Sequence, residues 1–347
     1  MKARYYSMSE IAEKTGTSRQ VISAILNNNW REKRISKKTF DRVSRAMDDI
    51  GYVPDRTAIS LRKENRKSIG IVCHGPLYSH MLVALEKLNH YFLDSEESIE
   101  MHISSEGELT EAVRALMGHR VESLIILISP MLENFGIRDL KDVNLHKLLR
   151  AVPHLIYNFP FDVHEKWIED KYLEIGSHLI GFSRKQAYLP FLEHLVEQNL
   201  KNILIDEKIF SILKKGSKTS QILSTFNNIE IYSNPQSGRL AENTFRIGEV
   251  LAEILLPSLR AHPFDYILTF SDGIAQGVAC RLEDYGIKIP YDLRILGFDK
   301  VDALKYFKYP ISSIEVPVDE MIQKTIFLCE ERPSQNQSYR TKTKLYL

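Results

Sequence analysis

The pattern of apolar and polar positions divides the chain into a helical N-terminal part and a longer part in which strands and helices alternate. In residues 8–50, apolar side chains recur at intervals of three and four, which predicts short amphipathic helices. From residue 68 onward, short apolar runs alternate with amphipathic stretches, which predicts parallel sheets with helices on both faces. The predicted strands span residues 69–73, 98–103, 123–128, 154–157, 202–205, 230–232, 266–270 and 294–297, and predicted helices include 79–93, 109–118, 184–198, 238–258 and 273–285.

Residues 8–27 predict two helices joined by a tight turn. Gly16 supplies the turn, because glycine adopts a left-handed backbone at little cost. Ser18 is placed to cap the second helix, whose apolar stripe leaves Arg19 and Gln20 facing outward. This is the plan of a helix-turn-helix, in which the start of the second helix enters the major groove of DNA. Helical proteins that bind no DNA also contain such pairs, so the motif alone leaves both interpretations open.

A third helix and a charge asymmetry favour the DNA-binding interpretation. Ser36 is placed to cap this helix and Gly51 to end it, and its apolar residues are Phe40, Val43, Met47 and Ile50. Three small helices can share one core, which two alone rarely do. Residues 1–66 contain 15 Lys and Arg against 8 Asp and Glu, a net charge of +7, whereas residues 67–347 carry −6. A basic head of this kind is expected to contact phosphate.

Two further motifs extend the pattern. The spacing Y-x-P-[ND]-x-x-A-x-x-L follows the third helix at Tyr52, Pro54, Asp55, Ala58 and Leu61. With the three helices before it and the apolar strand after it, this order resembles the lactose/galactose repressor (LacI/GalR) family of bacterial transcription regulators. Residues 264–310 resemble a second motif of that family, with matches at Asp272, Ala275, Gly277, Gly286, Ile289, Pro290, Asp292, Gly297, Phe298, Asp299 and Pro310.

The resemblance implies an all-α helix-turn-helix head on an α/β body of two lobes, with the fold of periplasmic sugar-binding proteins. The implied domains are a DNA-binding domain at 1–53, a hinge helix and linker at 54–66, and an effector-binding and dimerisation domain at 67–347. Lobe 1 is expected at 67–160 plus 311–330, and lobe 2 at 161–310 plus 331–347. Ligands of open α/β sheets bind beyond the carboxyl ends of the strands, so two facing lobes form a cleft.

The resemblance also assigns residues of the head to DNA. It implies that Arg19, Gln20 and Ala24 face base edges, where Arg pairs with guanine and Gln with adenine. It implies that Ser18, Ser23 and Asn27 bind phosphate, and that Ala58 and Leu61 enter the minor groove. The loop at residues 28–35 is open to two interpretations, with Trp30 as a lid on the core or with its basic residues as additional phosphate contacts.

The implied effector residues are Asp299, Ser271 and Asp272. Asp299 follows a strand and so lies at the ligand edge of a sheet, whereas Asp272 serves equally well as a helix cap. The arginine that grips the effector in relatives is missing, because no arginine occurs between Arg184 and Arg239. The family's aspartate is also missing from residues 181–187. A sugar or related metabolite, a different small molecule and a loss of effector response all remain open.

Composition narrows the function classes. Apolar residues form 44% of the chain, but the sequence contains no run of 18 or more of them, so no membrane span is expected. The first ten residues lack the apolar region of a signal peptide. The three cysteines and eleven histidines show no metal-binding spacing, so we expect buried thiols in the cytoplasm, no metal and no cofactor.

The predicted function follows from the resemblance and from these exclusions. It is a homodimeric repressor on a near-palindromic operator, with an affinity modulated by a small ligand. The alternatives are a cytoplasmic small-molecule-binding protein without a DNA-binding role, or an enzyme. The sequence contains no phosphate loop and no G-x-S-x-G motif, which disfavours the enzyme.

Overall fold

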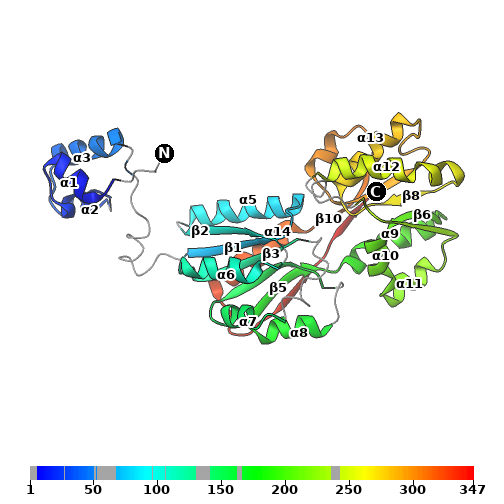
Figure 1. Cartoon of the computed structure of the whole chain (residues 1–347), viewed down its shortest axis with the longest axis horizontal. Helices are drawn as coiled ribbons and strands as arrows, with labels where there is room; N and C mark the ends of the chain where they lie inside the picture. Colours follow the sequence, from blue (N-terminus) through cyan, green and yellow to red (C-terminus); the bar gives the residue numbers. More distant parts are fainter. Residues whose placement is uncertain are drawn as a thin grey trace. The chain divides into compact units, whose positions relative to one another are not determined.

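The computed structural model describes residues 6–26, 28–50, 52, 68–95, 97–105, 107–129, 141–161, 166–235 and 243–347. The chain separates into two compact units, Met1–Arg66 and Lys67–Leu347 (Figure 1). The predicted hinge, with Ala58 and Leu61, and the predicted phosphate contact of Asn27 lie outside the described residues.

The N-terminal unit contains the three predicted helices, α1 (Met8–Thr15), α2 (Arg19–Leu26) and α3 (Lys37–Ile50). A capping box starts α1, because the Glu10 backbone N–H donates to Ser7 Oγ and the Ser7 N–H donates to Glu10 Oε2. Gly16 ends the helix with a left-handed φ of 59°, as the turn between the two helices requires. Ser36 caps α3 as predicted, its Oγ accepting from the Thr39 N–H at 3.2 Å.

The three helices of this unit share one small core. Ile11, Ile22 and Val43 are fully buried in it, one from each helix. Trp30, in the loop before α3, stacks on Phe40 with 4.7 Å between ring centroids. Trp30 is therefore the lid on this core, while the loop also leaves its basic side chains exposed. Both interpretations of the loop are compatible with this arrangement.

The second unit is built on two six-stranded sheets. The first has the order β11-β5-β4-β3-β1-β2 and is parallel throughout. Its strands are β1 (Ser68–His74), β2 (Ser98–Ser104), β3 (Ser123–Ile128), β4 (His154–Phe159), β5 (Ser177–Phe182) and β11 (Ser338–Thr341). Its helices are α5 (Ser79–Asp94), α6 (Leu109–Gly118), α7 (Val143–Arg150), α8 (Lys166–Glu174) and α14 (Val318–Glu331). Because α5 and α6 pack into separate cores, both faces of this sheet are covered.

The second sheet has the order β12-β10-β9-β8-β6-β7, with only β12 antiparallel among the described pairs. Its strands are β6 (Asn202–Asp206), β7 (Asn228–Tyr232), β8 (Tyr266–Leu268), β9 (Arg294–Asp299), β10 (Ser312–Glu315) and β12 (Lys344–Tyr346). Around it lie α9 (Arg184–Glu197), α10 (Glu207–Lys214), α11 (Ser217–Leu223), α12 (Thr244–Ala261), α13 (Asp272–Asp284) and the 3-10 helix η3 (Asp302–Tyr306). All eight predicted strands are present, and the two-lobed α/β body is confirmed.

The limits of the lobes differ from those expected from the sequence. The first sheet continues through β5, so lobe 1 runs to Phe182 rather than to residue 160. Segment 311–330 is divided, because β10 pairs with β9 in the second sheet whereas α14 packs on the first sheet, as expected. Segment 331–347 is divided as well, because β11 pairs with β5 in the first sheet whereas β12 pairs with β10 in the second, as expected. These late strands are short and largely polar, so their apolar pattern is too weak to reveal which sheet they join.

Among the described residues, no helix is long and apolar enough to cross a membrane.

Candidate functional site

The head presents the start of α2 at its surface. Ser18 precedes the helix, and its Oγ accepts a hydrogen bond from the Val21 N–H at 3.3 Å, the predicted cap. Arg19 and Gln20 are exposed on the first turn. With Ser23 and Lys33 they line a concave surface that encloses a pocket of about 850 Å³. This arrangement places a guanidinium and a carboxamide, the two side chains that pair bidentately with guanine and adenine, at one open end of a helix.

Ala24 lies differently from the other predicted base-reading residues. Its side chain is only 7% exposed and forms part of the floor of the same concave surface. Its carbonyl accepts from the Asn29 N–H at 3.1 Å, which joins the end of α2 to the following loop. Ala24 therefore lines the same surface as Arg19 and Gln20, with little of its side chain accessible, and its contact with a base edge stays a prediction.

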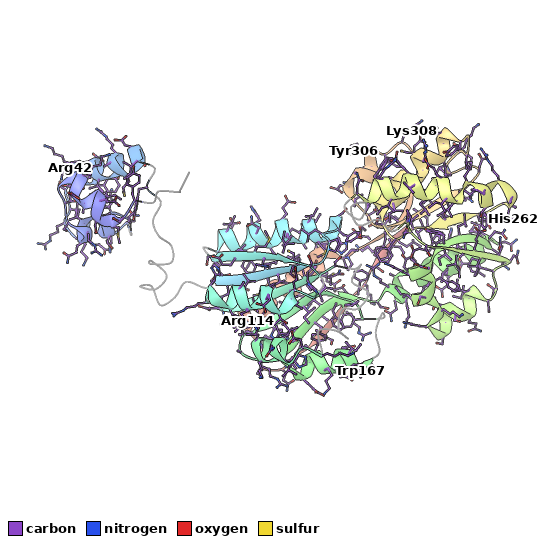
Figure 2. The ribbon with its side chains drawn as sticks, viewed as in Figure 1. Arg42, Arg114, Trp167, His262, Tyr306 and Lys308 are labelled. Carbon is purple, nitrogen blue, oxygen red and sulfur yellow. The ribbon has the colours of Figure 1, made fainter. Side chains whose placement is uncertain are left out.

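Further cations surround this surface of the head. Arg31 lies over the Trp30 ring, with 5.1 Å from its guanidinium carbon to the ring centroid, so its stem is held by the core lid. Lys33 and Arg34 in the same loop are exposed, and Arg42 of α3 points outward from the head (Figure 2). These exposed cations of the head are therefore accessible to a polyanion such as DNA.

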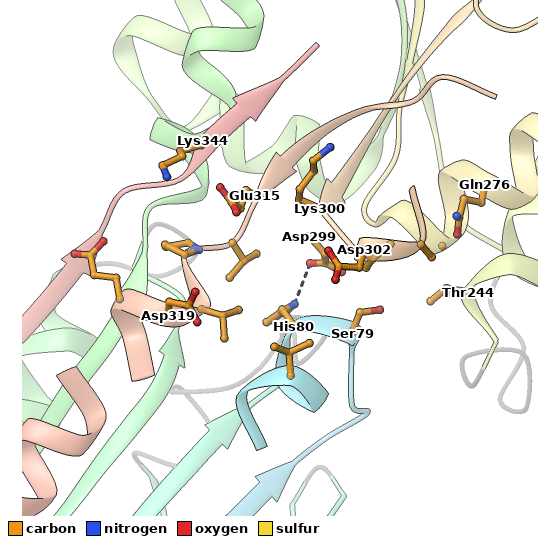
Figure 3. Close-up of a pocket in the computed structure, with 18 of the residues that line it drawn as sticks. Ser79, His80, Thr244, Gln276, Asp299, Lys300, Asp302, Glu315, Asp319 and Lys344 are labelled. Carbon is orange, nitrogen blue, oxygen red and sulfur yellow. Dashed lines mark hydrogen bonds and ion pairs between the residues drawn. The ribbon is translucent and has the colours of Figure 1, made fainter. Parts of the chain in front are cut away.

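In the body, one hydrogen bond joins residues from the two lobes. His80 lies in the first turn of α5, and Asp299 ends β9 in the other sheet. His80 Nδ1 contacts Asp299 Oδ1 at 2.9 Å, and both side chains are buried (Figure 3). They line one wall of a groove of about 730 Å³, to which Lys300, Glu315 and Asp319 also contribute. The predicted effector residue Asp299 thus lies at the junction of the lobes.

The other two predicted effector residues have internal roles. Asp272 is fully buried, with Oδ1 accepting from Ser313 Oγ at 2.6 Å and Oδ2 accepting from the Val301 N–H at 2.9 Å. Ser271, rather than Asp272, is the N-cap of α13, since its Oγ accepts from the Ile274 N–H. Burial raises the pKa of Asp272 to about 7. These bonds tie β9, β10 and α13 together, so a direct ligand contact is not supported for either residue.

Sequence reasoning missed Arg184, which follows β5 at the junction of the lobes. Its guanidinium carbon lies 4.8 Å from the centroid of the Phe270 ring, 4.9 Å from that of Phe298 and 5.5 Å from that of Phe182. The residue is 6% exposed, and desolvation lowers the pKa of its guanidinium. The available signal was an arginine directly after a strand end, in the segment where the family's aspartate is missing.

A second buried carboxylate stands at the end of β6. Asp206 caps α10, its Oδ1 accepting from the backbone N–H groups of Lys208 at 2.8 Å and Ile209 at 3.3 Å. Its Oδ2 accepts from Asn234 Nδ2. Burial raises the pKa of Asp206 to about 6. Among the described residues, no group of three or more His, Cys, Asp or Glu side chains could hold a metal ion.

Comparisons with known proteins agree with this architecture. Residues 7–55 match the family described as "Bacterial regulatory proteins, lacI family". Residues 234–344 match a "Periplasmic binding protein-like domain". The transcriptional regulator AscG of Escherichia coli is 23% identical over 328 residues, which cover 92% of this chain and 90% of AscG.

Two solved structures share the fold. A lac repressor dimer bound to operator and the anti-inducer ONPF is 17% identical, with a TM-score of 0.70 and coverage of 99% of this chain and 98% of that one. A complex of the transcriptional regulator CelR with cellobiose is 15% identical, with a TM-score of 0.57 and the same coverage. The chain thus carries the DNA-binding domain of the lacI family of bacterial regulatory proteins, followed by a periplasmic-binding-protein-like domain.

Proposed function

We propose that this protein is a DNA-binding transcriptional regulator of the repressor type. The observation that carries the proposal is the exposure of Arg19 and Gln20 on the first turn of α2, in a head of net charge +7. Their side chains read base edges in the major groove, while Ser18, Ser23 and the basic loop contact phosphate. The names of the relatives, which are transcriptional regulators, support the same role and favour regulation over catalysis.

The body is the sensor for a small ligand. Its two sheets direct the carboxyl ends of β1, β5, β8 and β9 toward one junction, where residues of both lobes meet. A ligand changes the affinity for DNA only if it binds the two arrangements of the lobes unequally. The cellobiose complex of CelR supports a small-molecule effector. We infer that Asp299, at the junction of the lobes, contacts it.

We infer that the regulator acts as a homodimer in the cytoplasm. Exposed apolar side chains stand on α5 and on the edge strand β2, with Leu82 52% exposed, Met101 57% and Ile103 61%. Apolar side chains on an unpaired sheet edge favour association, and these two elements lie side by side (Figure 1). A twofold dimer presents two heads to a near-palindromic operator, and the lac repressor dimer on its operator supports this arrangement.

The proposal is tested by retardation of duplex DNA at low and at physiological salt. The full chain is expected to bind random duplex DNA weakly and more weakly as salt rises, because the contact with phosphate releases counterions. Deletion of residues 1–66 is expected to abolish the binding. A full chain that fails to retard DNA even at low salt would refute the regulator and favour a small-molecule-binding protein without a DNA-binding role.

A further inference from the structure

Unpartnered polar atoms gather where the two lobes of the body meet. Arg184 Nη1, Tyr188 Oη and His80 Nε2 are buried and have no hydrogen-bond partner among the described residues. The exposed fractions are 6% for Arg184, 0% for Tyr188 and 3% for His80. His80 is bonded to Asp299, and Arg184 and Tyr188 lie against the ring of the preceding residue, Phe298. Proteins satisfy the large majority of such buried atoms, so three of them gathered at this place indicate a site for a polar group.

The Arg184 guanidinium lacks a counter-ion in contact. Within the described part of the chain, Arg184 forms no ion pair with a carboxylate. The aromatic rings of Phe182, Phe270 and Phe298 surround its guanidinium instead. Asp299 lies close enough to influence it electrostatically, but the Asp299 carboxylate is bonded to His80 at 2.9 Å. A desolvated charge is costly unless it is paired, and the rings compensate for only part of that cost.

We propose that Arg184 and Tyr188 bind the anionic group of a small metabolite, a carboxylate or a phosphate. This deepens the sensor role proposed above and rests on it. Arg184 then supplies, from the start of α9, the effector-gripping arginine that the sequence lacks between residues 185 and 238. A neutral sugar would leave the guanidinium without a compensating charge, which favours an anionic ligand.

The chemistry of the cluster fits an oxyanion. A guanidinium has only donors in a planar fork, which matches the two oxygens of a carboxylate or phosphate. The Tyr188 hydroxyl is free to donate to the same group. Tyr188 follows Arg184 by four positions on α9, and both side chains lie against the Phe298 ring, so they are neighbours. His80 and Asp299 border both this cluster and the groove of Figure 3, so the anionic group is bound next to residues from both lobes.

The test measures the melting temperature of the full chain, without DNA, against rising concentrations of three probes. Sodium acetate and sodium phosphate are each exchanged for sodium chloride at constant ionic strength and pH, and D-glucose is the neutral probe. A ligand that binds only the folded state raises the melting temperature, and the stabilisation grows with the logarithm of its concentration relative to its Kd. We expect acetate or phosphate to stabilise the wild type more than chloride does, and the larger effect distinguishes a carboxylate from a phosphate ligand.

Three variants connect the effect to the site. Arg184→Gln is expected to weaken anion binding by roughly tenfold or more, the effect of losing one charge-assisted hydrogen bond. Tyr188→Phe keeps the aromatic ring and is expected to weaken anion binding several-fold. This variant tests the site if Arg184→Gln does not fold. The matched control is Arg294→Gln, an exposed arginine 6.0 Å from the Tyr266 ring, which is expected to bind like the wild type.

The remaining outcomes overturn the proposal. They are stabilisation by glucose alone, the absence of any anion effect, and an anion effect that persists unchanged in both Arg184→Gln and Tyr188→Phe. Retardation of DNA is measured on the same preparations. A chain that binds DNA but not these anions refutes the ligand class alone, whereas a chain that binds anions but not DNA refutes the regulator.

Discussion

Replacement of Asp272 by asparagine is expected to change how the stability of the body depends on pH. The carboxyl is fully buried between Ser313 and Val301, and burial raises its pKa from 3.8 to about 7. Asparagine has nearly the same shape. Its carbonyl oxygen can accept from the Val301 N–H, while its amide donates to Ser313 Oγ, which reverses the direction of that hydrogen bond. The substitution therefore keeps both contacts and removes the ionisation.

The sign and size of the effect follow from linkage between folding and proton binding. Below pH 4 the carboxyl is protonated in both states. Between pH 4 and 7 the unfolded chain loses this proton while the folded chain keeps it, so the wild type loses stability as pH rises, by roughly 1.4 kcal/mol per pH unit. The shift from 3.8 to about 7 corresponds to a total of about 4 kcal/mol, complete above pH 7.

The assay is urea unfolding of the full chain at pH 5, 6, 7 and 8, followed by circular dichroism. The stability of Asp272→Asn minus that of the wild type is expected to increase with pH and to level off above 7. Asp206, with a pKa raised to about 6, affects both proteins equally and cancels in this difference. The exposed Asp302→Asn serves as control, because a salt bridge to Lys305 lowers the pKa of Asp302 and keeps it ionised throughout this range. A difference that stays constant with pH would refute the reasoning.

Other substitutions test the reading surface and the packing of the body. Arg19→Ala is expected to cost about 1–3 kcal/mol at one base position of the operator, and an equal loss on all sequences would make Arg19 a phosphate contact instead. Lys33→Ala is expected to weaken binding uniformly and to reduce the slope of log affinity against log salt by about one. Gly277→Ala is expected to destabilise the body by about 1–3 kcal/mol in urea unfolding, because its Cβ would lie 2.0 Å from the Phe245 carbonyl oxygen and force α12 and α13 apart. Gly118→Ala, with no atom within 4 Å, is the matched control and should be neutral or stabilising; equal losses at the two glycines would contradict this account.

Local rules accounted for most of the head. The cap at Ser18, the turn at Gly16 and the cap at Ser36 are each a single residue type at a position that requires it, and each is present in the structure. The burial of Ala24 could not be predicted in this way. It depends on the angle at which α2 packs on the other helices, and a helical period of 3.6 residues does not determine that angle.

In the body, the central strands were predictable and the edges were not. Strands such as β3, with all six residues buried, carry continuous apolar runs that are typical of parallel sheets. The strands β10 and β11 have the sequences SSIE and SYRT, which lack a continuous apolar run. The sheet that β11 joins is decided by its pairing with β5, more than a hundred positions earlier in the chain. The composition of these strands could not predict which sheet each joins, because that depends on where the chain passes from one lobe to the other.

Only one side of the candidate effector site could be predicted from the sequence, for the same reason. Asp299 was found because it directly follows a strand that carries a family motif, but its partner His80 is 219 positions away and belongs to the other lobe. On its own side, Asp299 is held by a rigid frame, since Asp272 binds the Val301 N–H and Ser313, and Ser313 Oγ accepts from the Lys300 N–H at 3.1 Å. The contact from His80 is the part of this arrangement that crosses between lobes. A ligand that binds Arg184 beside Asp299 would therefore act at the contact between the lobes. A small change in lobe spacing alters this contact and leaves the frame of the second lobe intact. Control of DNA binding requires such a difference in ligand binding between two arrangements of the lobes.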